Sequence, residues 1–141
     1  MKSIVFTSAI ELVGRIKARE MSVVEVVTAF LAQIKRYNPT LNAICDLRDE
    51  DEILKEAAQK DEEVLRGQEL GLLHGLPMTI KDSFLVTGLK NSNGDPLWRN
   101  YIAEEDAELV QRIKAEGAII IGKTNTPLYC IDWQSTNFWN G

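Results

Sequence analysis

The second half of the chain reads as strand, helix, strand, and this order constrains the fold more than any other feature. Pro77–Ile80 is a short apolar run, residues 104–116 carry apolar side chains at helical spacing, and Ala118–Ile121 is typical of a buried strand. A helix that connects two such strands makes them parallel, with a right-handed crossover. The sequence therefore predicts an α/β region over residues 69–141, built around a βαβ unit.

Residues 1–68 predict helices instead. Two serines are each followed three residues later by a glutamate, a capping box that opens a helix. We expect these helices to pack on part of a mixed β-sheet within a single domain. The expected elements are a helix from Ser8 to about Arg19, a helix from Ser22 that ends at Tyr37-Asn-Pro39, a strand over Leu41–Cys45, and a helix from Asp49 to about Arg66.

Composition narrows the classes of partner. The net charge of −5 argues against nucleic acid as the main partner, and no apolar run approaches the ~20 residues that span a bilayer. Glu11 interrupts the N-terminus before the apolar core of a signal peptide develops. Two cysteines far apart are most simply reduced thiols. We expect a cytoplasmic protein that binds neither nucleic acid nor a membrane.

Lys81 follows the Pro77–Ile80 run, where the charge of an ammonium group is hard to solvate. Burial would favour the neutral amine, and a neutral amine near pH 7 is a general base. Lys81 and Gly122–Asn125 would both lie at the carboxyl edge of the sheet, where ligands of such sheets bind. The structural alternative is that Lys81 reaches solvent and pairs with Asp82.

The other reactive side chains are few. A Ser-His-Asp triad or a Cys-His pair would have to use His74, which lies in a turn. His74, Cys45 and Cys130 do not show the spacing of zinc ligands. We expect no metal and no cofactor, and Lys81 is the most plausible base for hydrolytic chemistry.

Gly117–Thr124 fits the phosphate-loop pattern G-x-x-x-x-G-K-[ST] letter for letter. A phosphate loop needs a strand before its first glycine and a helix after its lysine. Here a helix precedes Gly117, the central residues predict a strand, and Pro127 follows closely. We therefore reject a nucleotide-binding loop.

Several motifs together resemble the amidase signature hydrolases in order and spacing. The resemblance covers nearly the whole chain and implies an amidase, a hydrolase acting on non-peptide C–N bonds, of which residues 1–141 would be the N-terminal part of the domain. The motifs are Leu73–Asp82, Asp106 to Gly117, Ile119–Pro127, Gln134–Asn137, and the opening segments Ser22–Val27 and Tyr37–Ala43.

The resemblance implies that Lys81 is the base of a Ser-Ser-Lys triad, in which a first serine activates a second as the nucleophile for an acyl-enzyme. In the family both serines belong to a Gly/Ser-rich segment that follows an Asn-Pro-Trp stretch, and this sequence stops at Trp139–Gly141. None of its six serines has Gly-Gly-Ser-Ser-Gly-Gly surroundings. We expect the chain to be inactive alone. The alternative is a truncated, non-catalytic pseudo-amidase that depends on a partner.

The resemblance also places Tyr129 and Cys130 on the acyl side of the substrate cleft, although both residue types are as common in a packed core. Asn91–Asp95 stands where relatives carry a Thr-x-Gly-Ser-like turn, so the sequence does not identify the substrate. We expect Lys81 to be poorly exposed. We also expect Ile119–Ile121 to form a strand with an unpaired edge, and hence self-association or a partner chain.

Overall fold

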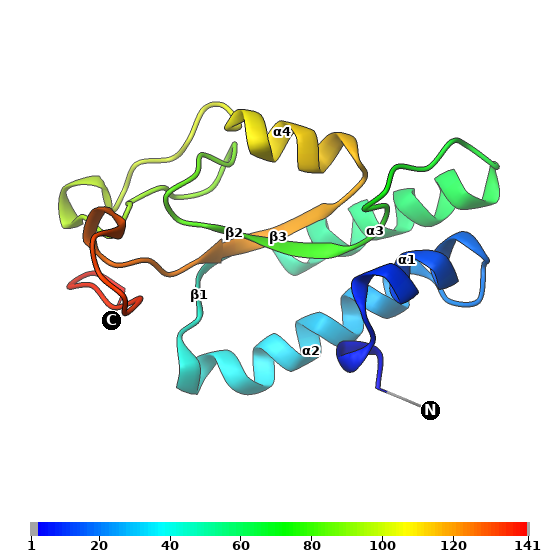
Figure 1. Cartoon of the computed structure of the whole chain (residues 1–141), viewed down its shortest axis with the longest axis horizontal. Helices are drawn as coiled ribbons and strands as arrows, with labels where there is room; N and C mark the ends of the chain where they lie inside the picture. The colour runs from blue at the N-terminus through cyan, green and yellow to red at the C-terminus, as the bar shows by residue number, and fades with distance from the viewer. Residues whose placement is uncertain (1–2, 141) are drawn as a thin grey trace.

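The computed structural model describes residues 3–140 and shows a three-stranded sheet with helices on both faces (Figure 1). No helix within residues 3–140 is long and apolar enough to cross a membrane. In chain order the elements are η1 (Ile4–Phe6), α1 (Ala9–Lys17), α2 (Val23–Leu41), β1 (Ile44–Leu47), α3 (Glu50–Leu65), β2 (Pro77–Lys81), η2 (Pro96–Trp98), α4 (Glu108–Ala115), β3 (Ile119–Thr124) and η3 (Leu128–Cys130).

The sheet has the strand order β1-β3-β2. β2 and β3 are parallel and are connected through α4, which confirms the predicted βαβ unit, and β1 pairs antiparallel with β3. β3 is the central strand because the short segment after α2 returns along it as β1 and pairs with Gly122–Thr124. A further hydrogen bond from Arg48 N to Ile121 O at 3.0 Å continues this pairing, so the expectation of an unpaired edge at Ile119–Ile121 is contradicted at Ile121 only.

Side chains along β3 point alternately to the two faces of the sheet, and this divides the core into two layers. Ile119 and Ile121 pack with α1, α2 and α3, whereas Ile120 packs with Val110 of α4 on the opposite face. Successive strand residues point to opposite faces, so a continuous isoleucine run suits a strand covered on both sides. Figure 1 shows α4 on one side of the sheet and α1 and α2 on the other.

The two helix starts that the serine caps predict are confirmed. Ser22 and Glu25 form the reciprocal capping box, and the Ser8 side chain accepts a hydrogen bond from Glu11 N. The predicted stop at Tyr37-Asn-Pro39 is wrong, because α2 continues through Pro39 to Leu41. A proline this close to a helix end removes only one hydrogen bond, and the extra turn lets Asn38 bind both backbone polar groups of Ile44 at 2.8 Å.

α4 begins at Glu108 rather than near Glu104. Asp106 explains the later start, because its carboxylate accepts hydrogen bonds from Thr87 N at 2.8 Å and from Lys114 Nζ at 2.7 Å. These contacts hold Asp106 in the loop that crosses over the sheet. The helix is thereby anchored to the segment that follows β2.

Candidate functional site

Lys81 is the last residue of β2 and is aligned with Thr124 of β3, so it lies at the same sheet edge as Asn125, as predicted. The expectation that Lys81 is poorly exposed is wrong. Ile80 turns into the core beside α4, so its neighbour Lys81 turns to the other face. At that point the described residues leave the Lys81 side chain open to solvent.

The lysine that is buried is Lys123 of β3, whose exposed fraction is 0%. Its Nζ donates to Lys90 O at 3.0 Å and Asn91 Oδ1 at 3.1 Å, and it lies 3.6 Å from Asp82 Oδ1. Burial lowers the pKa of Lys123, and the Asp82 carboxylate opposes that shift. The sequence did not reveal this lysine because β3 was expected to end at Ile121, which would have left Lys123 in a loop.

Asp82 is also buried, and its partners differ from those expected. It accepts hydrogen bonds from Ser92 N at 3.2 Å and from Ser92 Oγ at 2.5 Å, while its own N–H donates to Thr124 O. Of the structural alternative for Lys81, exposure to solvent is confirmed. The pairing with Asp82 is wrong, because the cation paired with Asp82 is Lys123. Asp82, Ser92 and Lys123 form what we call the buried polar network.

Cys130 lies beside Lys81. Its Sγ is 3.3 Å from Thr126 Oγ1 and donates to Asn93 Oδ1 at 3.6 Å. The hydrogen bond with Thr126 lowers the pKa of the Cys130 thiol, and the side chains of Lys81 and Ser83 act in the same direction. The thiol is exposed, so the structure places two of the three predicted site residues, Lys81 and Cys130, together at an open edge.

Tyr129 points elsewhere. Its hydroxyl donates to Asp95 Oδ2, and this hydrogen bond raises the pKa of Tyr129. Tyr129 and Cys130 both have left-handed backbone conformations, with φ of 48° and 61°. Consecutive left-handed residues turn the two side chains toward different neighbours, so Cys130 meets Lys81 while Tyr129 lines a separate cavity with Trp98 and Tyr101.

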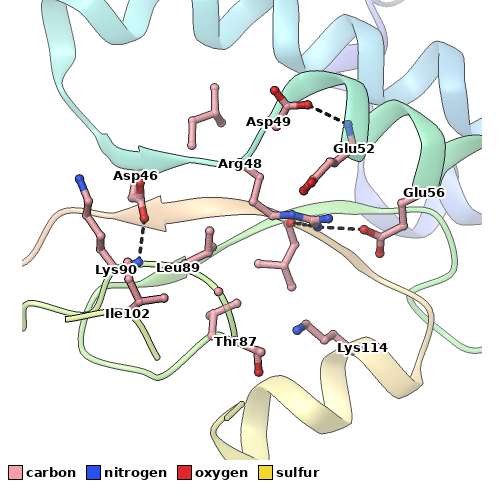
Figure 2. Close-up of a pocket in the computed structure, with 14 residues that line it drawn as sticks. Asp46, Arg48, Asp49, Glu52, Glu56, Thr87, Leu89, Lys90, Ile102 and Lys114 are labelled. Atoms are coloured by element: carbon pink, nitrogen blue, oxygen red, sulfur yellow. Dashed lines mark hydrogen bonds and ion pairs between the residues drawn. The ribbon is translucent and has the colours of Figure 1, made fainter. Parts of the chain in front are cut away.

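The largest cavity described lies away from these residues, between β1, α3 and α4, with a volume of about 590 Å³. Figure 2 shows Arg48 directed at Glu56 of α3, Asp46 bonded to the backbone at Lys90, and Lys114 projecting from α4. Two of the cations that line this cavity are paired with neighbouring acids, Arg48 with Glu56 and Lys114 with Asp106. None of the predicted site residues lines this cavity.

His74 has no place in the candidate site. It is buried against Gly117, with Nε2 3.0 Å from Lys60 O and Nδ1 3.7 Å from Glu63 Oε2. These contacts fix the turn before β2 to α3. Within residues 3–140 no group of three His, Cys, Asp or Glu side chains is arranged to hold a metal ion.

The comparisons with known proteins agree with the fold. The family model described as Amidase matches residues 25–138, and the chain therefore belongs to the amidase family. It is 45% identical over 121 residues to indoleacetamide hydrolase of Bradyrhizobium diazoefficiens, covering 85% of this chain and 23% of that protein.

A second relative is an acylamidase of Rhodococcus erythropolis, 34% identical over 85% of this chain and 25% of that protein. Among solved structures, a bacterial aryl acylamidase of the amidase signature family superimposes with a TM-score of 0.88 at 25% identity, covering 96% of this chain and 28% of that chain. The predicted family and fold are confirmed. The chain spans about a quarter of the length of the curated relatives it matches.

Proposed function

We propose that this chain supplies the general base, Lys81, for hydrolysis of a carboxamide C–N bond through an acyl-enzyme. The position of Lys81 carries the proposal, because it stands at the carboxyl end of a parallel strand in an amidase-family fold. The buried polar network fixes the backbone beneath it, while its side chain remains open to a reacting partner. Tyr129 and Cys130 would border the substrate.

In this proposal the remaining part of the amidase domain covers this edge and excludes water, which favours the neutral amine of Lys81. The neutral amine removes a proton from a serine, which activates the second serine of the triad for attack on the amide carbonyl. None of the six serines in this sequence lies in the Gly/Ser-rich motif that carries the two triad serines in the family. Ser92 is buried and bound to Asp82, which makes it unsuitable as a nucleophile. We therefore propose that the 141 residues alone do not hydrolyse amides.

A chimera tests the role of Lys81. These residues would replace the matching segment of the indoleacetamide hydrolase relative, and kcat/KM would be measured for the chimera and its variants. Lys81→Ala should lower kcat/KM by about 10²- to 10⁴-fold, the usual contribution of a general base. Lys81→Arg should not rescue activity, because a guanidinium group stays protonated.

Lys55→Ala serves as the control, since Lys55 is an exposed lysine on α3 and should leave kcat/KM unchanged. An active chimera in which Lys81→Ala and Lys55→Ala behave alike would refute the proposed base.

We also propose that the chain self-associates or binds a partner chain. Large apolar side chains near the C-terminal end are almost fully exposed, with exposed fractions of 79% for Ile131, 102% for Trp133 and 98% for Phe138. Large exposed apolar side chains that gather into a patch mark interaction sites, and these three lie within eight residues of one another in the sequence. Sedimentation velocity should show species larger than a monomer, and a single compact monomer with cooperative thermal unfolding would contradict the proposal.

A further inference from the structure

A second cavity of about 400 Å³ lies beside the candidate site. This volume falls within the range of small-molecule pockets. Its lining combines three aromatic side chains with three small polar ones, as ligand pockets commonly do. The lining residues are Asn91, Ser92, Asn93, Trp98, Tyr101 and Tyr129.

The aromatic walls are held in place by their own loop. Trp98 and Tyr101 form an edge-to-face pair with ring centroids 5.9 Å apart and an interplanar angle of 79°. Asp95 connects this pair to the third ring, because its carboxylate accepts hydrogen bonds from Leu97 N at 2.8 Å and from the Tyr129 hydroxyl. The hydrogen bond with Tyr129 also lowers the pKa of Asp95, which keeps its carboxylate ionised as an acceptor.

The polar floor of the cavity leads to the candidate base. Ser92 is bonded to Asp82, the residue that follows Lys81 in the chain. Asn93 Oδ1 accepts from Cys130 Sγ at 3.6 Å, and Cys130 in turn contacts the Lys81 side chain. A ligand whose ring lies between Trp98 and Tyr129 would therefore extend its polar end past Asn93 toward Lys81.

We propose that this cavity binds the aromatic ring of an aryl or arylalkyl carboxamide and so selects aromatic over aliphatic amides. The role of the amide group in this proposal rests on the proposed function. The binding site for the ring is argued from the cavity alone. Offset or edge-to-face contacts with Trp98, Tyr101 and Tyr129 stabilise an aromatic ring beyond its area burial. An aliphatic amide gains no such contact, and the Asn91 and Asn93 side chains can hydrogen-bond either amide.

Binding to the 141-residue chain tests the cavity without requiring catalysis. Phenylacetamide and indole-3-acetamide would be titrated into the isotope-labelled chain, with isobutyramide as the aliphatic probe, and Kd would be taken from NMR shifts. We expect shifts at the indole N–H of Trp98 and a Kd for the aromatic probes at least about fivefold below that of isobutyramide. Trp98→Ala should raise the aromatic Kd about fivefold or more, whereas Trp133→Ala, which changes a fully exposed tryptophan outside the cavity, should not.

Tyr101→Leu provides a second variant if Trp98→Ala does not fold, and it should also raise the aromatic Kd while leaving that of isobutyramide unchanged. Equal affinity for aromatic and aliphatic probes, no binding of the aromatic probes, or shifts confined to Trp133 or Trp139 would overturn the proposal. Its failure is separable from that of the proposed function. An active chimera that depends on Lys81 but hydrolyses isobutyramide as well as phenylacetamide would support the proposed hydrolase function and refute the aromatic site.

Discussion

The buried polar network and the open edge beside it differ in how their charged groups are satisfied. Lys123 and Lys81 lie on neighbouring strands, one residue apart in register. Lys123 is enclosed and has three oxygen partners within 3.6 Å, whereas Lys81 is exposed and lies against the Cys130 thiol. A buried charge must be fully paired to be tolerated, and such a group is committed to structure. The exposed lysine is not committed to a buried pair of this kind.

Removing the buried charge should have the largest effect. Lys123→Met leaves the Asp82 carboxylate buried without its cation, and breaking a buried pair in this way costs about 3–5 kcal/mol of unfolding free energy. Lys81→Met should change the free energy of unfolding by less than about 0.5 kcal/mol, as is usual for surface sites. Urea denaturation of the two variants measures the difference directly.

A double variant sharpens this test. Lys123→Met with Asp82→Asn removes both charges and should recover part of the lost stability, because no unpaired charge remains. Equal unfolding free energies for Lys123→Met and Lys81→Met would show that the two lysines do not differ in the way described.

The two cysteines show the same contrast between a buried and an exposed group. Burial raises the pKa of the Cys45 thiol to about 11, and its Sγ donates to Lys123 O at 3.5 Å. The Cys130 thiol is exposed and has a lowered pKa. Since the thiolate is the reactive form, iodoacetamide at pH 8 should alkylate Cys130 about 100-fold faster than Cys45, or more.

Mass spectrometry of the alkylated peptides gives both rates in one sample. Cys45→Ala and Cys130→Ala identify each signal and show whether one alkylation affects the other. Comparable rates at the two positions would mean that the interior at Cys45 opens readily.

A smaller effect should appear in the pH dependence of stability. The pKa of Cys45 is raised from 9.0 in the unfolded chain to about 11 in the fold, so its contribution is complete below pH 9 and is lost as pH rises toward 11. Allowing for solvent screening of this partly exposed thiol, wild type should lose about 1 kcal/mol more than Cys45→Ala between pH 8 and 10.5. The lowered pKa of Lys123 acts in the opposite direction in both proteins. It cancels only in part from the comparison, because the Cys45 thiolate itself raises the pKa of Lys123. Parallel pH profiles for the two proteins in urea denaturation would contradict the assignment.

Local sequence signals predicted the elements well where short-range chemistry decides them. The serine caps of α1 and α2, the aspartate cap of α3 and the parallel β2 and β3 strands all follow from such signals. The extension of α2 through Pro39 did not, because it depends on Asn38 binding Ile44 six residues later.

The candidate site was predicted in position but not in detail. Lys81 is at the expected strand end, but which of two nearby lysines is buried depends on how far β3 extends and on Asp82 and Asn91. Those contacts join segments that are distant in the sequence. The cavity beside Tyr129 was likewise missed, because its rings meet only through the turn that Asp95 organises.

We propose that these residues carry the base of an amide hydrolase at Lys81 and lack its nucleophile. The most direct test is amide hydrolysis by the chromatographically clean 141-residue chain, measured as ammonium release from phenylacetamide and nitroaniline release from 4-nitroacetanilide. We expect no turnover above the buffer rate, and equal traces for wild type and Lys81→Ala, since loss of a nucleophile costs on the order of 10⁶ in kcat in a serine protease. Turnover by wild type that Lys81→Ala abolishes would contradict it and would place a nucleophile within these residues.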